Sequence, residues 1–192
     1  MKWIGYLLSS LWRLWFLLIF MLVFIAFMPA LFFFTGIIKN EIIVANLTRY
    51  WSKLTIYLSF IYPKVEWEEK LDKKTQYIFC PNHVSTLDIP LILAVLPMPL
   101  QYMGKVEIAK IPLFGYFYKN NTVVVHRANK RDAYGAFLKA GDKLKKGINM
   151  CIFPEGGIPK TDVFLKKFKN GSFRLAIDQN IKTVPITMPD SK

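Results

Sequence analysis

Hydrophobic and polar positions divide the chain into two parts with different patterns. Between Arg13 and Lys39 there is no charged residue, and residues 14–34 form an almost unbroken apolar run. As a helix this run is long enough to cross a bilayer's hydrocarbon core of about 30 Å, although Pro29 and Gly36 are places where it could bend or end early. We do not expect a cleavable signal peptide, because the run is too long and no small-residue cleavage site follows it.

Residues 41–62 predict an amphipathic helix. Its apolar face carries Ile43, Leu47, Tyr50, Leu54, Tyr57 and Ile61, and another face carries Asn46, Arg49 and Lys53. Such a helix suits a bilayer interface, so the two elements predict either one span followed by a surface helix or a helical hairpin in one leaflet. Basic residues balance across the apolar run and give no orientation. A helix pair buried within the fold is the remaining alternative.

From residue 63 onward short apolar runs alternate with helical patterns. Strands are predicted at 64–67, 76–80, 100–104, 121–126, 150–153 and 183–187, helices at 89–96, 130–146 and 171–179, and a short helix or turn at 111–119. This alternation predicts an α/β fold with a central, mostly parallel or mixed sheet covered by helices. We therefore expect N-terminal membrane-anchoring helices over residues 1–62 and an α/β domain over residues 63–192.

The net charge and the cysteine content limit the kinds of binding partner and site that the sequence predicts. The 192-residue chain has 26 Lys and Arg against 13 Asp and Glu, a formal charge of +13. Such an excess indicates an anionic partner: nucleic acid, an anionic leaflet or a phosphate-bearing substrate. The apolar N-terminal part favours the membrane, so we expect anionic membrane lipids and no nucleic acid. Cys80 and Cys151 lie in apolar runs with no disulfide framework or metal-ligand cluster, so we expect reduced core thiols and no metal site.

The segment 77–88 carries the first candidate chemistry. Its apolar run ends at the turn residues Pro81 and Asn82, which place His83 in a loop before the next helix, and Asp88 follows one turn into that helix. A carboxylate that binds one ring nitrogen leaves the other free, as in a general base. A capping box from Ser85 to Asp88 is an equally good explanation, and both can hold because Asp has two oxygens.

Two further candidates follow other predicted strands. In the turn 153–157, Gly156 and Gly157 allow close backbone approach to an anion or oxyanion, and the alternative is an ordinary glycine turn. Arg127 offers a fork suited to a phosphate monoester, and the alternative is a solvated surface charge. Because ligands gather beyond strand ends in open α/β sheets, we expect His83, Arg127 and Glu155 to converge.

Four ordered blocks of residues carry a family resemblance. They are His83 with Asp88; Lys105 and Glu107 with residues 111–115 and Arg127; residues 153–156; and residues 184–186. This set resembles the glycerolipid acyltransferase superfamily, and is most similar to bacterial 1-acyl-sn-glycerol-3-phosphate acyltransferases. The resemblance covers the chain from about residue 63 to its end, and the N-terminal helices are similar in kind to the family's membrane-binding pair.

The resemblance implies transfer of an acyl chain from acyl-CoA or acyl-carrier protein to the 2-hydroxyl of lysophosphatidate, giving phosphatidate. No cofactor and no covalent acyl-enzyme are expected. It implies that His83 is the general base and Asp88 orients it, that Arg127 and Lys105 hold the phosphate, and that Glu155, Gly156 and Gly157 line the acceptor site. It further implies a bacterial inner-membrane location with the active site at the cytoplasmic face.

The chain departs from the family pattern in three places. Residues 157–160 replace the usual threonine and arginine after Glu155 and Gly156, so we expect Lys160 to supply the cation. His126 stands where an acidic residue is common, and we interpret it as structural. The chain stops at Lys192, soon after the fourth block, where relatives continue, so we expect C-terminal truncation.

Three alternatives stay open. A related acyltransferase would use another acceptor, such as glycerol-3-phosphate, a lyso-aminolipid or a lipid A precursor. A hydrolase would need a nucleophile, and Ser85 lies near His83 without a nucleophile elbow. A non-enzyme would be a basic membrane adaptor that binds anionic lipid or nucleic acid.

Overall fold

The chain folds into two compact units. The computed structural model describes residues 2–126, 129–159 and 165–189. One unit comprises Met1–Glu66 with Pro90–Leu96, and the other comprises Trp67–Ile89 with Pro97–Lys192. The N-terminal unit therefore takes residues 90–96 from within the predicted α/β domain, in addition to the N-terminal helices.

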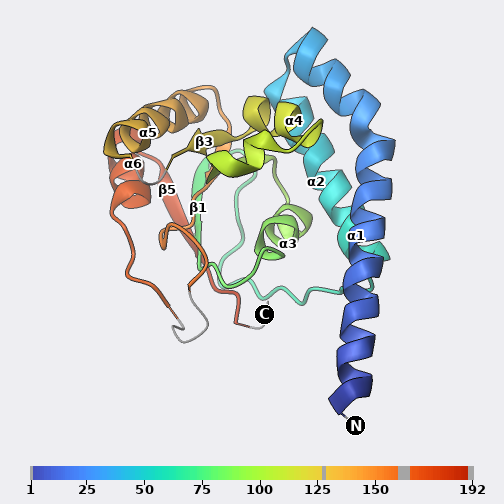
Figure 1. The fold of residues 1–192 in the computed structure, drawn as a ribbon. Helices are drawn as coiled ribbons and strands as arrows, with labels where there is room; N and C mark the ends of the chain where they lie inside the picture. Colours follow the sequence, from blue (N-terminus) through green and yellow to red (C-terminus); the bar gives the residue numbers. More distant parts are fainter. Residues whose placement is uncertain (1, 127–128, 160–164, 190–192) are drawn as a thin grey trace. The chain divides into compact units, whose positions relative to one another are not determined.

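The N-terminal unit begins with a helix that is longer than its apolar run. Helix α1 spans Lys2–Phe32 and contains Pro29, and a π-helical segment, η1 (Phe33–Ile38), follows it directly (Figure 1). The helix does not end at Pro29 or Gly36; it ends where Lys39 adopts a left-handed conformation. Residues Trp3–Ile38 form a helix long and apolar enough to cross a membrane, and only 22% of its most apolar window is buried. This helix indicates membrane association.

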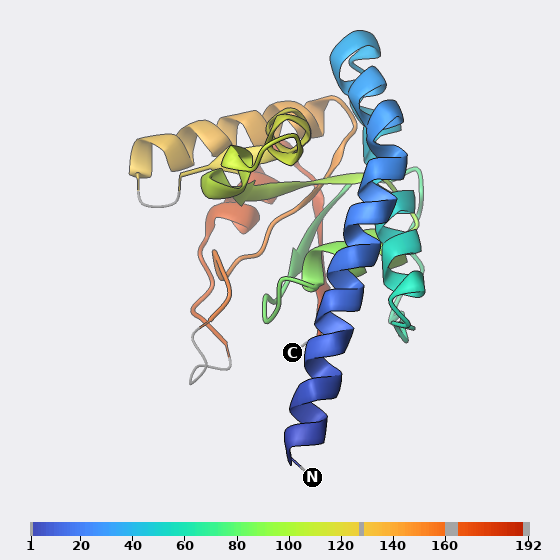
Figure 2. The same cartoon turned by 45° about the vertical axis from the view of Figure 1, so that its right-hand side comes forward.

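Helix α2 (Glu41–Leu58) lies antiparallel beside α1 (Figure 2). Asn40 caps its start by accepting a hydrogen bond from the Ile43 backbone N–H at 3.0 Å. At its end, the indole N–H groups of two α1 tryptophans donate to backbone carbonyls: Trp12 to Ser59 and Trp15 to Leu58, each at 3.1 Å. Because the last carbonyls of a helix lack internal partners, these bonds both cap α2 and fix it to α1.

The apolar face predicted for α2 is exposed. Tyr50 is 54% exposed and Leu54 44% exposed, whereas the helix buries another face that includes Trp51 and Ile56. Along α1, large apolar side chains are exposed at most positions from Trp3 to Ile25. A surface of this composition is unfavourable in water, and it fits the lipid-facing role predicted from the sequence.

The second unit is built on a five-stranded sheet in which every pairing is parallel. The strands are β1 (Tyr77–Pro81), β2 (Leu100–Lys105), β3 (Val123–Val125), β4 (Asn149–Cys151) and β5 (Lys182–Ile186), in the order β3-β2-β4-β1-β5. Its central strands are near-continuous apolar runs because both faces of a parallel sheet are covered. The predicted α/β fold is confirmed.

The strand predicted at residues 64–67 is wrong. The structure assigns no strand there, and Val65 and Trp67 are 40% and 48% exposed. Lys64 and Glu66 pair with each other on the surface at 2.8 Å. Alternation of polar and apolar residues predicts a strand only where a neighbouring strand and a buried face accept it, and this segment has neither.

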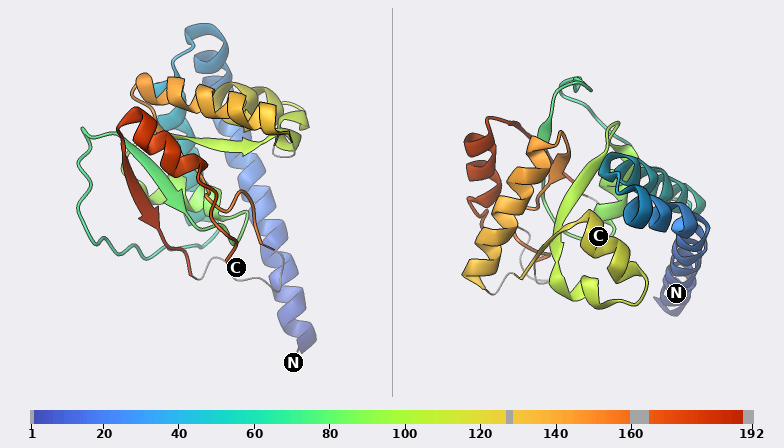
Figure 3. Two further views of the ribbon diagram at one scale, coloured as in Figure 1. Left: turned by 90° about the vertical axis from the view of Figure 1, so that its left-hand side faces the viewer. Right: turned by 90° about the horizontal axis from the view of Figure 1, so that it is seen from above.

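Among the residues that the structure describes, five helical segments connect the strands. They are α3 (Asp88–Val95), the 3-10 helix η2 (Val106–Lys110), α4 (Phe114–Asn121), α5 (Lys130–Lys145) and α6 (Gly171–Gln179). Helices α5 and α6 lie side by side on one face of the sheet (Figure 3). Their core contacts include Ala140 and Leu144 from α5, Leu175 from α6, and Ile78 and Met150 from the strands beneath. This core holds the strand ends, and the loops that follow them, in fixed positions.

The connections after β1 and β4 diverge at the centre of the sheet. β1 leads to β2 on one side of this adjacent pair, whereas β4 leads to β5 on the other side. Such a reversal is the topological switch point at which open α/β sheets bind ligands. The loops carrying His83 and Glu155 both begin there.

Candidate active site

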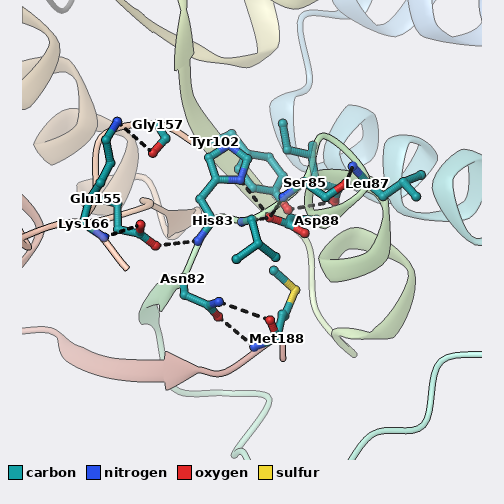
Figure 4. A network of polar contacts seen from close by, with 12 residues as sticks. Asn82, His83, Ser85, Leu87, Asp88, Tyr102, Glu155, Gly157, Lys166 and Met188 are labelled. Carbon is teal, nitrogen blue, oxygen red and sulfur yellow. Dashed lines mark hydrogen bonds and ion pairs between the residues drawn. The ribbon is translucent and has the colours of Figure 1, made fainter. Parts of the chain in front are cut away.

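His83 lies two residues beyond β1 and is buried, with 7% of its surface exposed. Its Nδ1 lies 2.8 Å from Oδ2 of Asp88 (Figure 4). Nε2 has no hydrogen-bond partner among the residues that the structure describes. The ring therefore has one nitrogen fixed by a carboxylate and the other available to a substrate, as expected for a general base.

The Asp88 carboxylate both orients the His83 ring and caps the start of α3, as the two explanations of this segment predicted. Oδ2 also accepts the backbone N–H groups of Val84 at 2.8 Å and Ser85 at 2.9 Å, so it orders the loop as a capping carboxylate while it holds the imidazole. Asp88 is fully buried and is the first residue of α3, so the expectation that it lies one turn into the helix is wrong. Two turn residues precede the helix, and they bring the carboxylate back under the His83 loop.

Glu155 joins the two loops at the switch point. It is 3% exposed; its Oε1 accepts the His83 backbone N–H at 2.7 Å and its Oε2 accepts the Lys166 backbone N–H at 3.0 Å. The predicted convergence of His83 and Glu155 is confirmed. Since each carboxylate oxygen already accepts a main-chain bond, Glu155 holds the loop that carries the base in position.

Asn82 is a site residue that the sequence analysis treated only as a turn former. Its side-chain amide donates to the Met188 carbonyl at 3.1 Å, and its Oδ1 accepts the Met188 N–H at 2.7 Å (Figure 4). This pair of bonds continues the β1–β5 pairing past the strand ends and fixes the residue before His83. Its position directly before His83 was the feature of the sequence that could have indicated this role.

An aromatic stack supports the imidazole from one side. Phe153 lies against the His83 ring with centroids 3.9 Å apart and planes 19° apart, and Tyr102 stacks on Phe153 at 5.9 Å. The Tyr102 hydroxyl donates to the Ile89 carbonyl at 2.9 Å. Burial raises the pKa of Tyr102 well above its ordinary value, as it does the pKa of Cys151, so both groups stay neutral at physiological pH. The sequence analysis missed Tyr102, which gave no signal beyond strand β2.

The backbone of the glycine turn agrees only in part with a role in binding an oxyanion. Gly156 has φ of 72° and Gly157 has φ of 150°, conformations that favour glycine. The Gly156 N–H, however, donates to the Phe153 carbonyl at 3.0 Å. This N–H stabilises the turn itself, so for Gly156 the ordinary glycine turn is the better description.

Of the three cations predicted to bind phosphate, Lys105 lies among the residues that the structure describes. Lys105, at the end of β2, pairs with Glu107 at 3.6 Å, and both side chains are about half exposed. Arg127 and Lys160 lie outside the described residues, so their roles stay predictions. His126, interpreted as structural, lies 3.4 Å from Asp132 on the surface.

A cavity of about 180 Å³ adjoins the glycine turn. Its wall includes Phe153, Pro154 and Gly156 from the turn, apolar residues of α5 and α6, and Lys169. His83 is not part of this wall. Phe153 therefore contacts both the cavity and the imidazole ring that it stacks on.

Comparison with known proteins identifies the family. The sequence pattern of the family described as Acyltransferase matches residues 63–189. The chain belongs to the acyltransferase family. Its His83 and Asp88 pair lies within the matched residues, together with the whole sheet of the second unit.

Individual acyltransferases show how far the similarity extends. The chain is 31% identical over 131 residues to the 1-acyl-sn-glycerol-3-phosphate acyltransferase of Saccharomyces cerevisiae, covering 67% of this chain and 43% of that one. It is 26% identical over 137 residues to the enzyme of that name from Borreliella burgdorferi, covering 71% and 54%. The crystal structure of the 1-acyl-sn-glycerophosphate acyltransferase PlsC from Thermotoga maritima superposes with a TM-score of 0.68 at 25% identity, covering 96% and 74%. The chain thus spans less than half the length of the yeast relative.

Proposed function

We propose that this chain transfers an acyl group from the thioester of acyl-CoA or acyl-carrier protein to the 2-hydroxyl of lysophosphatidate, forming phosphatidate. One observation carries the proposal: a buried imidazole is fixed by Asp88 on one nitrogen and available on the other, at the switch point of an acyltransferase-family fold. The names of the yeast and bacterial relatives support lysophosphatidate as the acceptor.

In the proposed reaction, His83 takes up and returns the proton. His83 Nε2 takes the proton of the 2-hydroxyl while that oxygen forms a bond to the thioester carbon, and Asp88 stabilises the resulting imidazolium. The tetrahedral intermediate then breaks its carbon–sulfur bond, and the leaving thiolate takes the proton from Nε2. A base held in this way contributes about 10² to 10⁴-fold in rate.

Ser85 does not have the arrangement of a hydrolytic nucleophile. Its hydroxyl oxygen accepts the Leu87 backbone N–H at 3.3 Å, and the His83 ring is fixed instead by Asp88. A serine nucleophile requires its hydroxyl within hydrogen-bond reach of the base. This local turn favours direct transfer to an alcohol over an acyl-serine intermediate.

The site works at a membrane in this proposal. The exposed apolar surfaces of α1 and α2 support membrane association, and both substrates carry acyl chains. A bacterial inner-membrane location is supported by the bacterial relatives, and a cytoplasmic active site would give access to acyl-CoA and acyl-carrier protein.

The test is acylation in vitro by the wild-type protein and by His83→Ala. With lysophosphatidate and acyl-CoA, the wild type should form phosphatidate, and His83→Ala should lose at least about 10²-fold in turnover while it still binds lipid vesicles. Parallel assays with glycerol-3-phosphate, a lyso-aminolipid and a lipid A precursor compare acceptors. Unchanged turnover by His83→Ala would refute the assignment of the base, and release of free fatty acid without acceptor would favour a hydrolase.

A further inference from the structure

The buried hydroxyl of Tyr102 binds the backbone directly after Asp88. Tyr102 lies on β2, is 8% exposed, and belongs to the polar network around His83 (Figure 4). Its hydroxyl donates to the Ile89 carbonyl at 2.9 Å. Because burial raises the pKa of Tyr102 well above its ordinary value, the hydroxyl keeps its hydrogen at physiological pH. That single hydrogen is committed to the first turn of α3, next to the carboxylate that fixes the base.

The first turn of α3 is locally disfavoured at this same residue. Asp88, Ile89 and Pro90 are the first three residues of the helix. A proline disfavours the helical conformation of the residue before it, because its ring crowds the backbone and Cβ of that residue. Ile89 is held in that conformation while it carries Asp88 at the helix start. A bond from outside the helix therefore stabilises this turn, and the Tyr102 hydroxyl supplies one.

The position of Asp88 is narrowly defined because one of its oxygens serves three donors. Oδ2 accepts the backbone N–H groups of Val84 and Ser85 and lies 2.8 Å from Nδ1 of His83. Since a carboxylate only accepts hydrogen bonds, this contact places the ring hydrogen on Nδ1 and leaves Nε2 to accept the substrate hydroxyl. A tilt of the first turn of α3 would disturb all three bonds together.

We infer that Tyr102 is a positioning residue for the acyl transfer, and that its hydroxyl, through Ile89, holds Asp88 against the imidazole. The inference rests on the proposed function, in which His83 is the base. The ring of Tyr102 makes a separate contribution, since it stacks on Phe153, which lies against the His83 ring. The hydroxyl thus supports the carboxylate of the catalytic pair, and the ring supports the imidazole.

Kinetics of Tyr102→Phe test the hydroxyl alone, because this variant keeps the ring and its stack on Phe153. It should lower kcat by about tenfold, since the base is correctly oriented for less of the time, and leave KM for lysophosphatidate within about twofold. Tyr77→Phe is the matched control. Tyr77 is 7% exposed at the start of β1, and its hydroxyl accepts the Asp72 backbone N–H at 3.1 Å. The control should keep wild-type kcat. Wild-type kcat in Tyr102→Phe, equal losses in the two variants, or a change in KM alone would overturn the inference.

Hydrogen exchange at the His83 ring measures the position of Asp88 without turnover. The chain has two histidines, so nuclear magnetic resonance of the full chain, labelled with heavy nitrogen at histidine in detergent micelles, reports on His83 and on the half-exposed His126. The Nδ1 hydrogen of His83 should be protected from exchange with water by its bond to Asp88. Tyr102→Phe should speed this exchange by about tenfold, because the pair opens more often, and Tyr77→Phe should not.

The exchange rates separate this inference from the proposed function. Unchanged exchange in Tyr102→Phe overturns the positioning role even if kcat falls. Faster exchange in Tyr102→Phe, in a protein whose wild type forms no phosphatidate, supports the positioning of Asp88 by Tyr102 and rejects the proposed reaction.

Discussion

Glu155 shows how one side chain can determine the position of a catalytic group without contacting the reaction. Its two oxygens accept N–H groups from residues 83 and 166, so two loops far apart in sequence are closed on one buried carboxylate. The imidazole itself is oriented by Asp88. Backbone position and ring orientation of the base are therefore controlled by different acidic residues, and changes at the two should have different consequences.

Glu155→Gln should reduce kcat by about 10²-fold with a smaller effect on KM, because an amide N–H₂ would replace one acceptor and face a backbone donor. The buried N–H left without a partner costs about 1–3 kcal/mol of stability. Kinetics and thermal unfolding of the purified protein measure both effects. The control is Glu66→Gln, an exposed surface residue, which should change neither. Wild-type kcat in Glu155→Gln would show that the carboxylate does not position the base.

At the scale of elements, α4 depends on one close approach. Gly115, in its first turn, is buried, and a Cβ there would lie 2.4 Å from the Ala109 carbonyl oxygen of η2. The obstruction is backbone, which cannot rotate away as a side chain can. The packing of α4 against η2 thus gives a structural reason for glycine at position 115, the last residue of the block 111–115.

Gly115→Ala should destabilise the protein by about 1–3 kcal/mol, since the added methyl group must push α4 and η2 apart. Gly135→Ala is the comparison variant. Gly135 lies inside α5, and a Cβ there would have no other atom within 4 Å. Gly135→Ala should stabilise the protein by up to about 1 kcal/mol through helix propensity. Chemical denaturation of both variants measures the difference. Equal stability of the two would show that α4 and η2 adjust freely.

The sequence predicted those elements whose signal is local. The five strands of the sheet follow from apolar runs, and the meeting of His83 with Glu155 follows from their places at strand ends. The strand expected at residues 64–67 failed because alternation does not reveal whether a neighbouring strand exists. Lys166 could not be placed beforehand, since its position depends on a long-range bond between its backbone and Glu155.

At the scale of the whole molecule, two forces can hold the chain on a membrane. The formal charge of +13 attracts anionic lipid, and the exposed apolar side chains of α1 and α2 favour transfer into the bilayer. The first force is screened by salt, with a Debye length of about 3 Å at 1 M, whereas the second is not weakened by it. Salt therefore separates a lipid-embedded enzyme from a basic adaptor held by charge.

The chain should float with vesicles of neutral phosphatidylcholine in a density gradient at 1 M NaCl, within about twofold of its recovery at 0.1 M, because the apolar surface of α1 anchors it. Adding anionic phosphatidylglycerol should increase recovery only at the lower salt concentration. A soluble basic protein of similar charge is the control, and it should leave both kinds of vesicle at 1 M NaCl. If the chain also leaves both kinds of vesicle at 1 M NaCl, then charge alone holds it on the membrane. The apolar face of α2 would then require a protein partner rather than lipid.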